Sequence, residues 1–252
     1  MHRFYLPPAE WHPDALRLTG AEAHHARNVL RLQPGAKAVL FNGRGREITA
    51  EVTGLAGRDV ELRKLHEATT PPLRCRITLG QAIPKGKNMD FIVQKAVEIG
   101  AAEIVPIVSD RTIVRLADDE AAQKQLKWQT VAIEAAKQCG QNWLPEVQTP
   151  RPLAQFFGER PAFDLQLIGS LQSDALHLKQ ILAEYSAAHN GSRPASVLML
   201  IGPEGDFTPA ELNVARAHGC RPITLGPIIL RVETAAIYCL SVLSYELLGF
   251  ER

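Results

Sequence analysis

At 252 residues, the chain is long enough to bury a full hydrophobic core, either as one large domain or as two smaller ones. Apolar residues make up 46% of the chain and charged residues 22%, which is typical of a folded globular protein and excludes an intrinsically disordered one. The net charge of +1 neither indicates nor excludes a nucleic-acid partner.

No membrane span is expected. The most apolar stretch, TAAIYCLSVLSYELLGF from Thr234, is too short to cross a bilayer comfortably and carries Glu246. It therefore predicts a buried helix. The opening residues, MHRFYLPPAEW, lack the long apolar core of a secretory signal, so we expect this segment to stay on the chain.

The cysteines indicate neither disulfides nor a metal site. They lie far apart, without a CxxC pair and without a histidine at metal-ligand spacing. We therefore expect reduced core residues of a cytoplasmic protein, and no bound metal, at Cys75, Cys139, Cys220 and Cys239.

The first part of the chain predicts a small β-rich domain. Residues Thr19 to Glu22 have the S/T-x-x-E form of a capping box and predict a short helix that ends near Leu32. The segment KAVLFNGRGREITAEVTGLAGRDVELRKL alternates β-forming residues with glycine-containing turns, which predicts an antiparallel meander or barrel. HEATTPPL then predicts a linker. We place the domain boundary after Pro72, so that residues 1–72 form one domain and residues 73–252 a second.

From Arg74 onward, predicted strands alternate with predicted helices. The strands are CRITLGQAI, EIVPIVS, FDLQLIGS and SVLMLIG. Helices are expected from Asn88 to Ile99, stopped by Gly100, and through QLKWQTVAIEAAKQCG and ALHLKQILAEYSAA. This alternation predicts an α/β domain with a parallel sheet covered by helices on both faces.

Two glycine-bearing loops follow predicted strands near the end of the chain. SVLMLIGPEGDFTPAELNVARAHG reads as strand, loop and helix, with a capping box at Thr208 and Glu211 and Pro209 at the first helical position. CRPITLGPIILRVETAAI repeats this plan. In open α/β sheets, ligands bind at the carboxyl ends of the strands, so both loops are candidates for a binding site. The glycines alone are equally compatible with ordinary tight turns.

The stretch LGPIILRVETAAI opens like a buried strand and then places Arg231 and Glu233 among apolar residues. Burying an unpaired charge costs several kcal/mol. The two residues are therefore expected either to pair with each other or to meet a ligand. Known nucleotide motifs do not fit: GQAIPKGKN has one residue too many for a P-loop, and GPEGD is not GxGxxG.

Several motifs together resemble one family. IGPEGDFTPAE followed by LGPIILRVETAA resembles the paired signature of the SPOUT-class RNA methyltransferases, and most closely the 16S ribosomal RNA uridine-N3 methyltransferases. The segments HRFYL, KGKNMDFIVQKAVEIGAAEIVPI, RTIVR and EAAKQCGQN are similar to that family's other motifs and stand in its order. The resemblance spans nearly the whole chain.

The resemblance implies a PUA-like N-terminal β-barrel domain that helps to hold RNA, and a C-terminal SPOUT domain with a parallel sheet and a trefoil knot. It also implies a cytoplasmic homodimer in rRNA processing, acting on 16S ribosomal RNA or the small ribosomal subunit, with S-adenosyl-L-methionine as the methyl donor. By the same resemblance, the donor is bound by Leu200, Gly202, Pro203, Glu204, Gly205, Leu225, Gly226, Leu230, Thr234 and Ala235.

The expected chemistry is methylation of N3 of uracil, which removes an imide proton and spreads negative charge onto the flanking carbonyl oxygens. Arg231 suits the stabilisation of that charge, because its guanidinium stays protonated and offers several donors. Glu204 or Glu233 is the candidate base, although either carboxylate could equally orient Arg231 or interact with a helix N-terminus. RNA contact is expected from Arg3, Arg27, Arg31, Lys85 and Lys87, with Arg27 and Arg31 on one face of the predicted helix.

Two residues depart from the family pattern, which generally has Gly at the position of Asp206 and Arg at that of Ile228. The loss of an arginine at Ile228 puts substrate affinity or activity in question. This departure leaves open a non-catalytic RNA-binding protein of ribosome assembly, and a second alternative is methylation of a ribose 2′-hydroxyl or another base.

The final helix is expected to contribute to the dimer interface through an apolar stripe at helical spacing, with ordinary core packing as the alternative. The residues of that stripe are Ile237, Leu240, Leu243 or Ser244, and Leu247.

Overall fold

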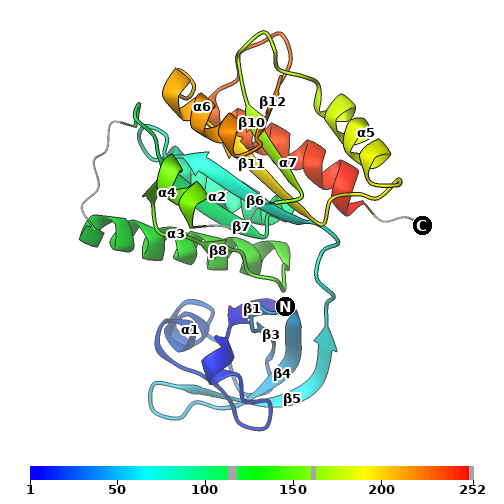
Figure 1. Cartoon of the computed structure of the whole chain (residues 1–252). Coiled ribbons are helices and arrows are strands. Elements are labelled where there is room, and N and C mark those ends of the chain that lie inside the picture. The colour runs from blue at the N-terminus through cyan, green and yellow to red at the C-terminus, as the bar shows by residue number, and fades with distance from the viewer. Residues whose placement is uncertain (113–117, 160–162, 250–252) are drawn as a thin grey trace. The chain divides into compact units, whose positions relative to one another are not determined.

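The structure is a computed structural model that describes residues 1–112, 118–159 and 163–249 (Figure 1). It divides into two compact units. The first comprises Met1–Pro72 together with Ile133–Leu144, and the second comprises Leu73–Ala132 together with Pro145–Arg252. The expected boundary at Pro72 thus coincides with one division point, while a later segment of the chain also belongs to the first unit. Residues 113–115 of the RTIVR motif lie outside the described residues.

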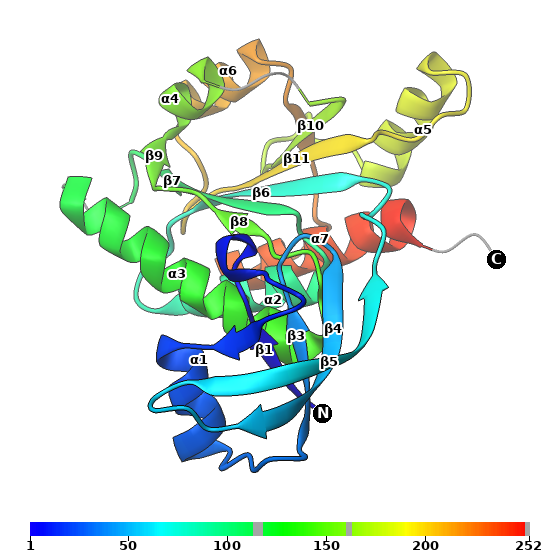
Figure 2. The same cartoon turned by 90° about the horizontal axis from the view of Figure 1, so that it is seen from below.

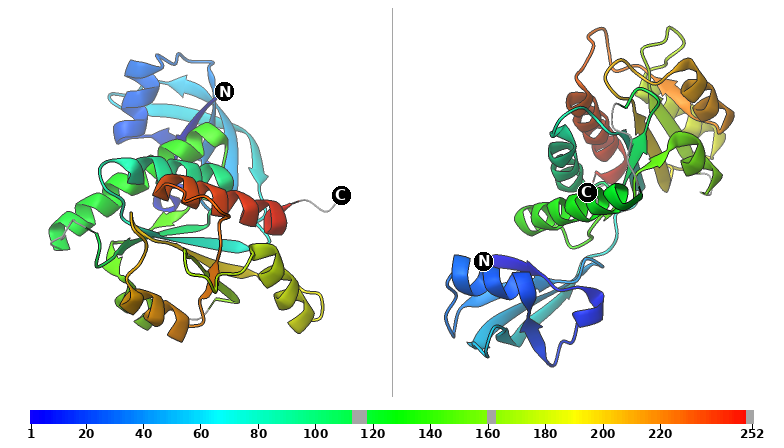
Figure 3. Two further views of the ribbon diagram at one scale, coloured as in Figure 1. Left: turned by 90° about the horizontal axis from the view of Figure 1, so that it is seen from above. Right: turned by 90° about the vertical axis from the view of Figure 1, so that its left-hand side faces the viewer.

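The first unit contains a curved sheet in the order β1-β3-β4-β5-β2, which confirms the predicted β-rich fold (Figure 3). The parallel pair joins β1 (His2–Tyr5) to β3 (Lys37–Phe41). The antiparallel pairs join β3 to β4 (Arg46–Gly54), β4 to β5 (Val60–Thr69), and β5 to β2 (Leu16–Leu18). The predicted linker was placed too early, because its first residues extend β5 to Thr69.

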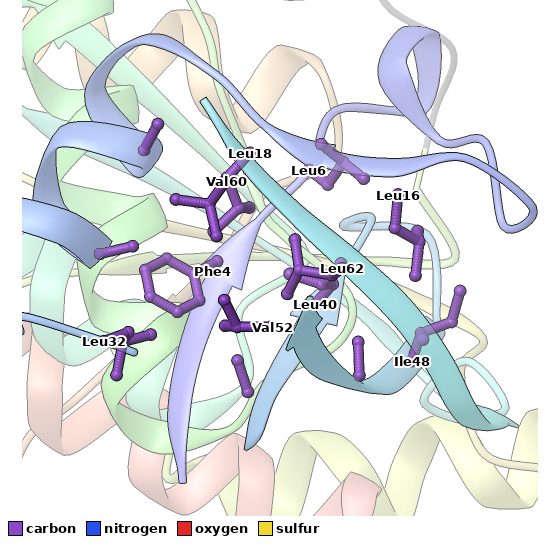
Figure 4. Packing of buried hydrophobic residues seen from close by; sticks show 14 of the residues in the cluster. Phe4, Leu6, Leu16, Leu18, Leu32, Leu40, Ile48, Val52, Val60 and Leu62 are labelled. Carbon is purple, nitrogen blue, oxygen red and sulfur yellow. The ribbon is translucent and has the colours of Figure 1, made fainter. Parts of the chain in front are cut away.

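The core of this unit lies on the concave side of the sheet, where apolar side chains alternate with outward-facing ones along each strand. Figure 4 shows Phe4, Leu40, Val52, Val60 and Leu62 pointing toward one another from four strands. All of them are buried, which provides the main hydrophobic stabilisation of the unit.

The helical segment of the first unit differs from its prediction. After the short 3-10 helix η1 (Pro8–Glu10), the chain forms α1 (Gly20–His24) and continues as the π-helix η2 (His25–Val29). The expected capping box at Thr19 is wrong, since the Thr19 hydroxyl donates to Glu10 and the Glu22 carboxylate binds a distant lysine instead.

The predicted common face of Arg27 and Arg31 is also wrong. The helix ends at Val29, and Arg31 follows it with φ 53°, in the left-handed region. The two side chains therefore do not share the regular spacing of one helix surface.

The second unit is built around a parallel sheet in the order β12-β10-β11-β6-β7-β8, with β9 (Arg151–Pro152) also paired to β7. This confirms the predicted α/β fold. The strands are β6 (Arg76–Ala82), β7 (Glu103–Val108), β8 (Glu146–Val147), β10 (Leu165–Gly169), β11 (Ser196–Ile201) and β12 (Arg221–Ile223).

Helices cover both faces of this sheet (Figures 2 and 3). On one face, α4 (Leu153–Gly158) and α6 (Pro209–Ala217) pack on a buried cluster that includes Phe156, Leu200 and Leu212. On the other face, α2 (Asn88–Ile99) packs beside α7 (Val232–Leu248). α2 has the predicted bounds and ends at Gly100, which has φ 96°. The remaining helices are α3 (Asp118–Cys139) and α5 (Leu178–Ala188).

The apolar stripe expected at the dimer interface lies mostly in the core. Leu240, Leu243 and Leu247 of α7 are buried, so the alternative of core packing is correct for them. The side chains that α7 exposes are instead Tyr238, which is 49% exposed, and Tyr245, which is 83% exposed.

Three of the four cysteines are buried as expected, and burial raises the pKa of the thiols of Cys75, Cys220 and Cys239 to about 12. Cys139 is exposed at the end of α3, so its assignment to the core is wrong. In the part of the chain that the structure describes, no helix has both the length and the apolar character to span a membrane.

Lys137 belongs to the first unit and connects the last turn of α3 to α1. Its side chain is only 7% exposed, and Nζ donates to Glu22 at 3.0 Å and to Glu134 at 2.9 Å. Burial raises the pKa of the Glu22 carboxyl, and the ammonium of Lys137 offsets part of that effect. The pair therefore depends on mutual neutralisation in a poorly hydrated place.

We predict that Lys137→Ala lowers the free energy of unfolding by about 3 kcal/mol, because it leaves the Glu22 carboxylate desolvated without its partner. The matched variant Glu134→Ala removes the exposed side of the same network and should cost less than about 1 kcal/mol. Equilibrium unfolding in urea measures both, and equal effects of the two variants would contradict the prediction.

Candidate functional site

A cavity of about 690 Å³ opens in the second unit where β10, β11 and β12 end. These strands are neighbours and run parallel, so the loops that follow them meet at one edge of the sheet. The first residues of α7 and the first residue of α2 complete the wall of the cavity. The residues that line the cavity are Asn88, Gly169, Ser170, Leu171, Gln172, Ile201, Gly202, Pro203, Glu204, Gly205, Asp206, Thr224, Leu225, Gly226, Pro227, Ile228, Ile229, Leu230, Arg231, Val232, Glu233 and Ala235.

The loop after β11 is a tight turn followed by a capped helix. The Asp206 amide donates to the Pro203 carbonyl at 3.0 Å, and Gly205 supplies the positive φ of 90° that this turn requires. The predicted capping box of α6 is confirmed: Thr208 and Glu211 each bind the other's backbone amide. The turn is therefore held between a central strand and a fixed helix N-terminus.

The loop after β12 is exposed rather than a continuation of the strand. β12 ends at Ile223, so the expected buried strand through Leu225 is wrong. Gly226 turns the chain with φ 104°, and the side chains of Ile228 and Ile229 are 73% and 76% exposed. Ile228 and Ile229 therefore line the cavity and do not belong to the core.

Arg231 and Glu233 stand at the start of α7, on the edge of the same cavity. Arg231 is the exposed N-cap residue, and Glu233 lies in the first turn, where the helix dipole favours a carboxylate. Within the described residues they form no ion pair with each other; Glu233 instead accepts a hydrogen bond from Asn88 Nδ2 at 3.3 Å. The expected ion pair between Arg231 and Glu233 is therefore wrong, and so is the expectation that both charges are buried, because Arg231 is exposed.

Glu204 links the loop after β11 to the segment that precedes α2. Its carboxylate oxygens accept from the backbone amide of Lys85, at 3.1 Å for Oε1 and 3.4 Å for Oε2. The side chains of Lys85 and Lys87 are exposed beside this contact. Two carboxylates and one guanidinium, those of Glu204, Glu233 and Arg231, thus line one cavity.

The cavity contains most of the residues expected to bind a cofactor. Gly202, Pro203, Glu204, Gly205, Leu225, Gly226, Leu230 and Ala235 line it, and so do the candidate catalytic residues Arg231 and Glu233. Two expected residues lie outside its described lining. Leu200 points into the core beneath α4 and α6, and its neighbour Ile201 takes the wall position because strand side chains alternate. Thr234 is exposed on α7.

The loop after β10 was missed from the sequence. Gly169, Ser170, Leu171 and Gln172 form one wall of the cavity. FDLQLIGS ends in Gly-Ser at the carboxyl end of a predicted strand, so the rule that selected the other two loops was applicable here as well. Asn88 was missed for another reason, because only the packing of α2 beside α7 brings it to this edge.

The residues expected to contact RNA have different surroundings. In the first unit, Arg3 is partly buried and donates to Glu47 at 3.0 Å and also to Asn142, while Arg27 donates to the Gly57 carbonyl. Arg31, Lys85 and Lys87 are exposed.

Comparison with known proteins now identifies the chain. A family model described as an RNA methyltransferase domain matches residues 71–244, and a model described as an RNA methyltransferase PUA domain matches residues 18–65. Among curated relatives, Ribosomal RNA small subunit methyltransferase E of Bacillus subtilis is 31% identical over 233 residues, covering 91% of this chain and 89% of the relative. The chain belongs to the ribosomal RNA small subunit methyltransferase E family.

Solved structures agree with this membership of the methyltransferase E family. A methyltransferase from Legionella pneumophila, solved in complex with S-adenosylmethionine, has a TM-score of 0.86 and 34% identity and covers 97% of each chain. A ribosomal RNA small subunit methyltransferase E from Neisseria gonorrhoeae, bound to S-adenosyl methionine, has a TM-score of 0.84 and 34% identity and covers 98% of each chain. The present chain is thus an RNA methyltransferase with a PUA-like N-terminal unit, as the motifs predict.

The cavity wall is packed too tightly for a side chain at Gly202. A Cβ there would lie 3.1 Å from the Phe207 amide nitrogen and 3.2 Å from Asp206 Oδ1. We predict that Gly202→Ala destabilises the protein by about 1–3 kcal/mol, because the turn has to shift.

Gly158, at the end of α4, is the matched control, because nothing lies within 4 Å of its Cβ position. Gly158→Ala should stabilise the protein by about 0.5–1 kcal/mol through helix propensity. Thermal and urea unfolding separate the two cases, and a neutral Gly202→Ala would show that the turn is looser than its contacts indicate.

Proposed function

We propose that this enzyme transfers the methyl group of S-adenosyl-L-methionine to N3 of a specific uridine in 16S ribosomal RNA of the small subunit. The observation that carries the proposal is the cavity at the carboxyl ends of β10, β11 and β12, with Arg231 at its edge, in a chain of the methyltransferase E family.

The cavity suits a nucleoside-containing methyl donor. Its volume of about 690 Å³ lies within the range of roughly 300–1,000 Å³ that is usual for small-ligand sites. Most of its lining residues belong to loops, whose backbone offers the amide donors and carbonyl acceptors that the edge of adenine requires. Glycines at 202, 205 and 226 permit a ligand to approach that backbone closely.

The residues at the rim suit the transfer. In the proposed reaction, N3 of uracil attacks the methyl carbon, the carbon–sulfur bond breaks, and its electron pair stays on sulfur. Glu204 or Glu233 accepts the N3 proton. Arg231, exposed at the cavity edge, donates to the carbonyl oxygen that gains negative charge.

RNA contact is assigned to both units. In the first unit, which matches the PUA model, Arg31 and Arg27 are the candidates, whereas Arg3 is already engaged by Glu47 and Asn142. In the second unit, the candidates are Lys85, whose backbone amide donates to Glu204 of the cavity loop, and Lys87, two residues further along the chain. Arg31, Lys85 and Lys87 are exposed, and Arg27 is half-buried; their positive charge suits contacts to phosphate groups.

The decisive experiment measures methyl incorporation from labelled S-adenosylmethionine into small-subunit RNA and into small-subunit particles, followed by nucleoside analysis. 3-Methyluridine as the product supports the proposal. A 2′-O-methyl nucleoside or another methylated base would show a different substrate atom. RNA binding without incorporation into either substrate would refute the proposal.

We predict that Arg231→Ala lowers turnover about a hundredfold, which corresponds to about 2.7 kcal/mol of transition-state stabilisation. Binding of the methyl donor should change much less, because the donor is held mainly by loop backbone. Single-turnover rates and calorimetric donor titration measure the two quantities.

Arg216→Ala is the matched control for this arginine, since Arg216 pairs with Asp174 on the surface and lies outside the described cavity lining. It should leave both quantities unchanged. Normal turnover in Arg231→Ala together with a lowered melting temperature would assign the arginine a structural role.

We also propose a cytoplasmic homodimer whose donor-binding region is tied in a trefoil knot, as the family resemblance implies. The exposed face of α7 supports an interface. Thr234, Tyr238, Ser241 and Tyr245 recur at helical spacing and are exposed, and Phe91 of the neighbouring α2 is 45% exposed. Aromatic side chains on a helix face are typical of protein interfaces.

For the dimer, we predict that Tyr238→Glu combined with Tyr245→Glu yields a monomer, because a buried interface does not accommodate two unpaired carboxylates. Leu126→Glu, at a side chain of α3 that is 65% exposed, is the control and should stay dimeric. Light scattering at micromolar concentration gives the masses. A monomeric wild-type protein would refute the dimer itself, and a dimeric double variant would refute this choice of interface.

A further inference from the structure

Asp206 occupies an unusual backbone position in the cavity wall. It closes the turn after β11 with φ 69°, in the left-handed region that favours glycine. Aspartate tolerates this region better than most residues, although at a greater cost than glycine. We therefore expect contacts of the Asp206 side chain to offset the conformational strain of its backbone.

The side chain of Asp206 joins two loops of the cavity. Oδ1 accepts from the Phe207 amide at 2.8 Å, within its own loop. Oδ2 accepts from the Leu171 amide at 3.3 Å, in the loop after β10. Both Asp206 and Leu171 line the cavity. One carboxylate thus fixes the separation of two walls between which a ligand has to fit.

The loop after β10 is anchored on its other side by backbone hydrogen bonds. Ser170 donates to the Ile223 carbonyl at 3.0 Å, and Leu176 donates to the Pro222 carbonyl at 3.1 Å, both at the end of β12. These bonds tie the loop to the end of β12, directly before the loop that forms the third wall. The Asp206–Leu171 bond connects it to the loop after β11, so the loop after β10 is tied both to β12 and to the loop after β11.

Arg111 holds the same turn from outside. Its guanidinium donates to the carbonyl oxygens of Gly205 and of Asp206, the latter at 3.3 Å. Arg111 belongs to the segment that follows β7, two strands away from β11 in the sheet. The backbone carbonyls of this turn therefore accept from the Arg111 guanidinium, while the Asp206 carboxylate accepts from the Leu171 amide.

We propose that Asp206 is a positioning residue for the methyl donor: its carboxylate holds the loops after β10 and β11 at the separation that the donor requires. This inference rests on the proposed donor binding. Because the loops are ordered before the donor arrives, binding does not have to supply the free energy of ordering them. The residue acts on donor affinity and not on the transfer step.

Asp206→Gly tests this role, since it removes the carboxylate and at the same time relieves the positive φ. We expect donor affinity to fall about tenfold, on the scale of one lost hydrogen bond to a charged acceptor. Turnover at saturating donor should stay within about twofold of wild type, because the reacting groups are untouched. Hydrogen exchange should become faster at the Leu171 amide even without donor.

Two further variants separate the side chain from the backbone. Asp206→Asn tolerates the same φ and keeps one side-chain oxygen, so its loss of affinity should be smaller than that of Asp206→Gly. Asn190→Gly is the matched control, because Asn190 also has a positive φ, of 54°, and lies outside the described cavity lining. It should leave donor affinity unchanged.

Wild-type donor affinity in Asp206→Gly, with unchanged exchange at Leu171, would overturn the inference and reduce Asp206 to a tolerated turn residue. Equal losses in Asp206→Gly and Asn190→Gly would overturn it as well. A wild-type protein that binds no donor in the same titration would instead refute the proposed function, so the two failures are distinguishable.

Discussion

The parallel register of three neighbouring strands is the constraint on which the site depends. β10 lies between β11 and β12, with Ile168 opposite Leu200 and Gly169 opposite Ile223. Strands that run in one direction and stop at one level deliver their following loops to a single edge. A shift of β12 by one residue would turn its side chains to the opposite face and move its loop away from the other two. The register of the sheet thus determines where the cavity lies, and the loop residues determine which chemical groups line it.

The exposed isoleucines of the loop after β12 show how a binding surface resembles a core in composition. Ile228 and Ile229 are residue types typical of a buried strand, yet they line the cavity and are largely exposed. Exposed apolar side chains beside a cavity are typical of a surface that a ligand or a partner covers. Their apolar character therefore carries information about binding rather than about folding.

Local patterns in the sequence predicted the elements well where the decisive contacts are local. The capping box at Thr208 is confirmed because its partner lies three residues away, whereas the similar pattern at Thr19 is wrong because Glu22 binds Lys137, far along the chain. The resemblance indicates Leu200, whereas strand alternation places the side chain of Ile201 in the cavity wall and that of Leu200 in the core. The loop at Gly169 was missed because only the strand order makes it adjacent to the other two loops.

The first unit is not a continuous piece of chain, and this has a consequence for how it can be separated. Its segment 133–144 returns after sixty residues of the second unit, from Leu73 to Ala132. The Trp143 indole donates to the Thr70 carbonyl, and the Gly45 amide donates to the Asn142 carbonyl. A single cut after Pro72 would remove these partners and uncover the surfaces they protect. The first unit can therefore be excised intact only together with the end of α3, a helix that begins in the second unit.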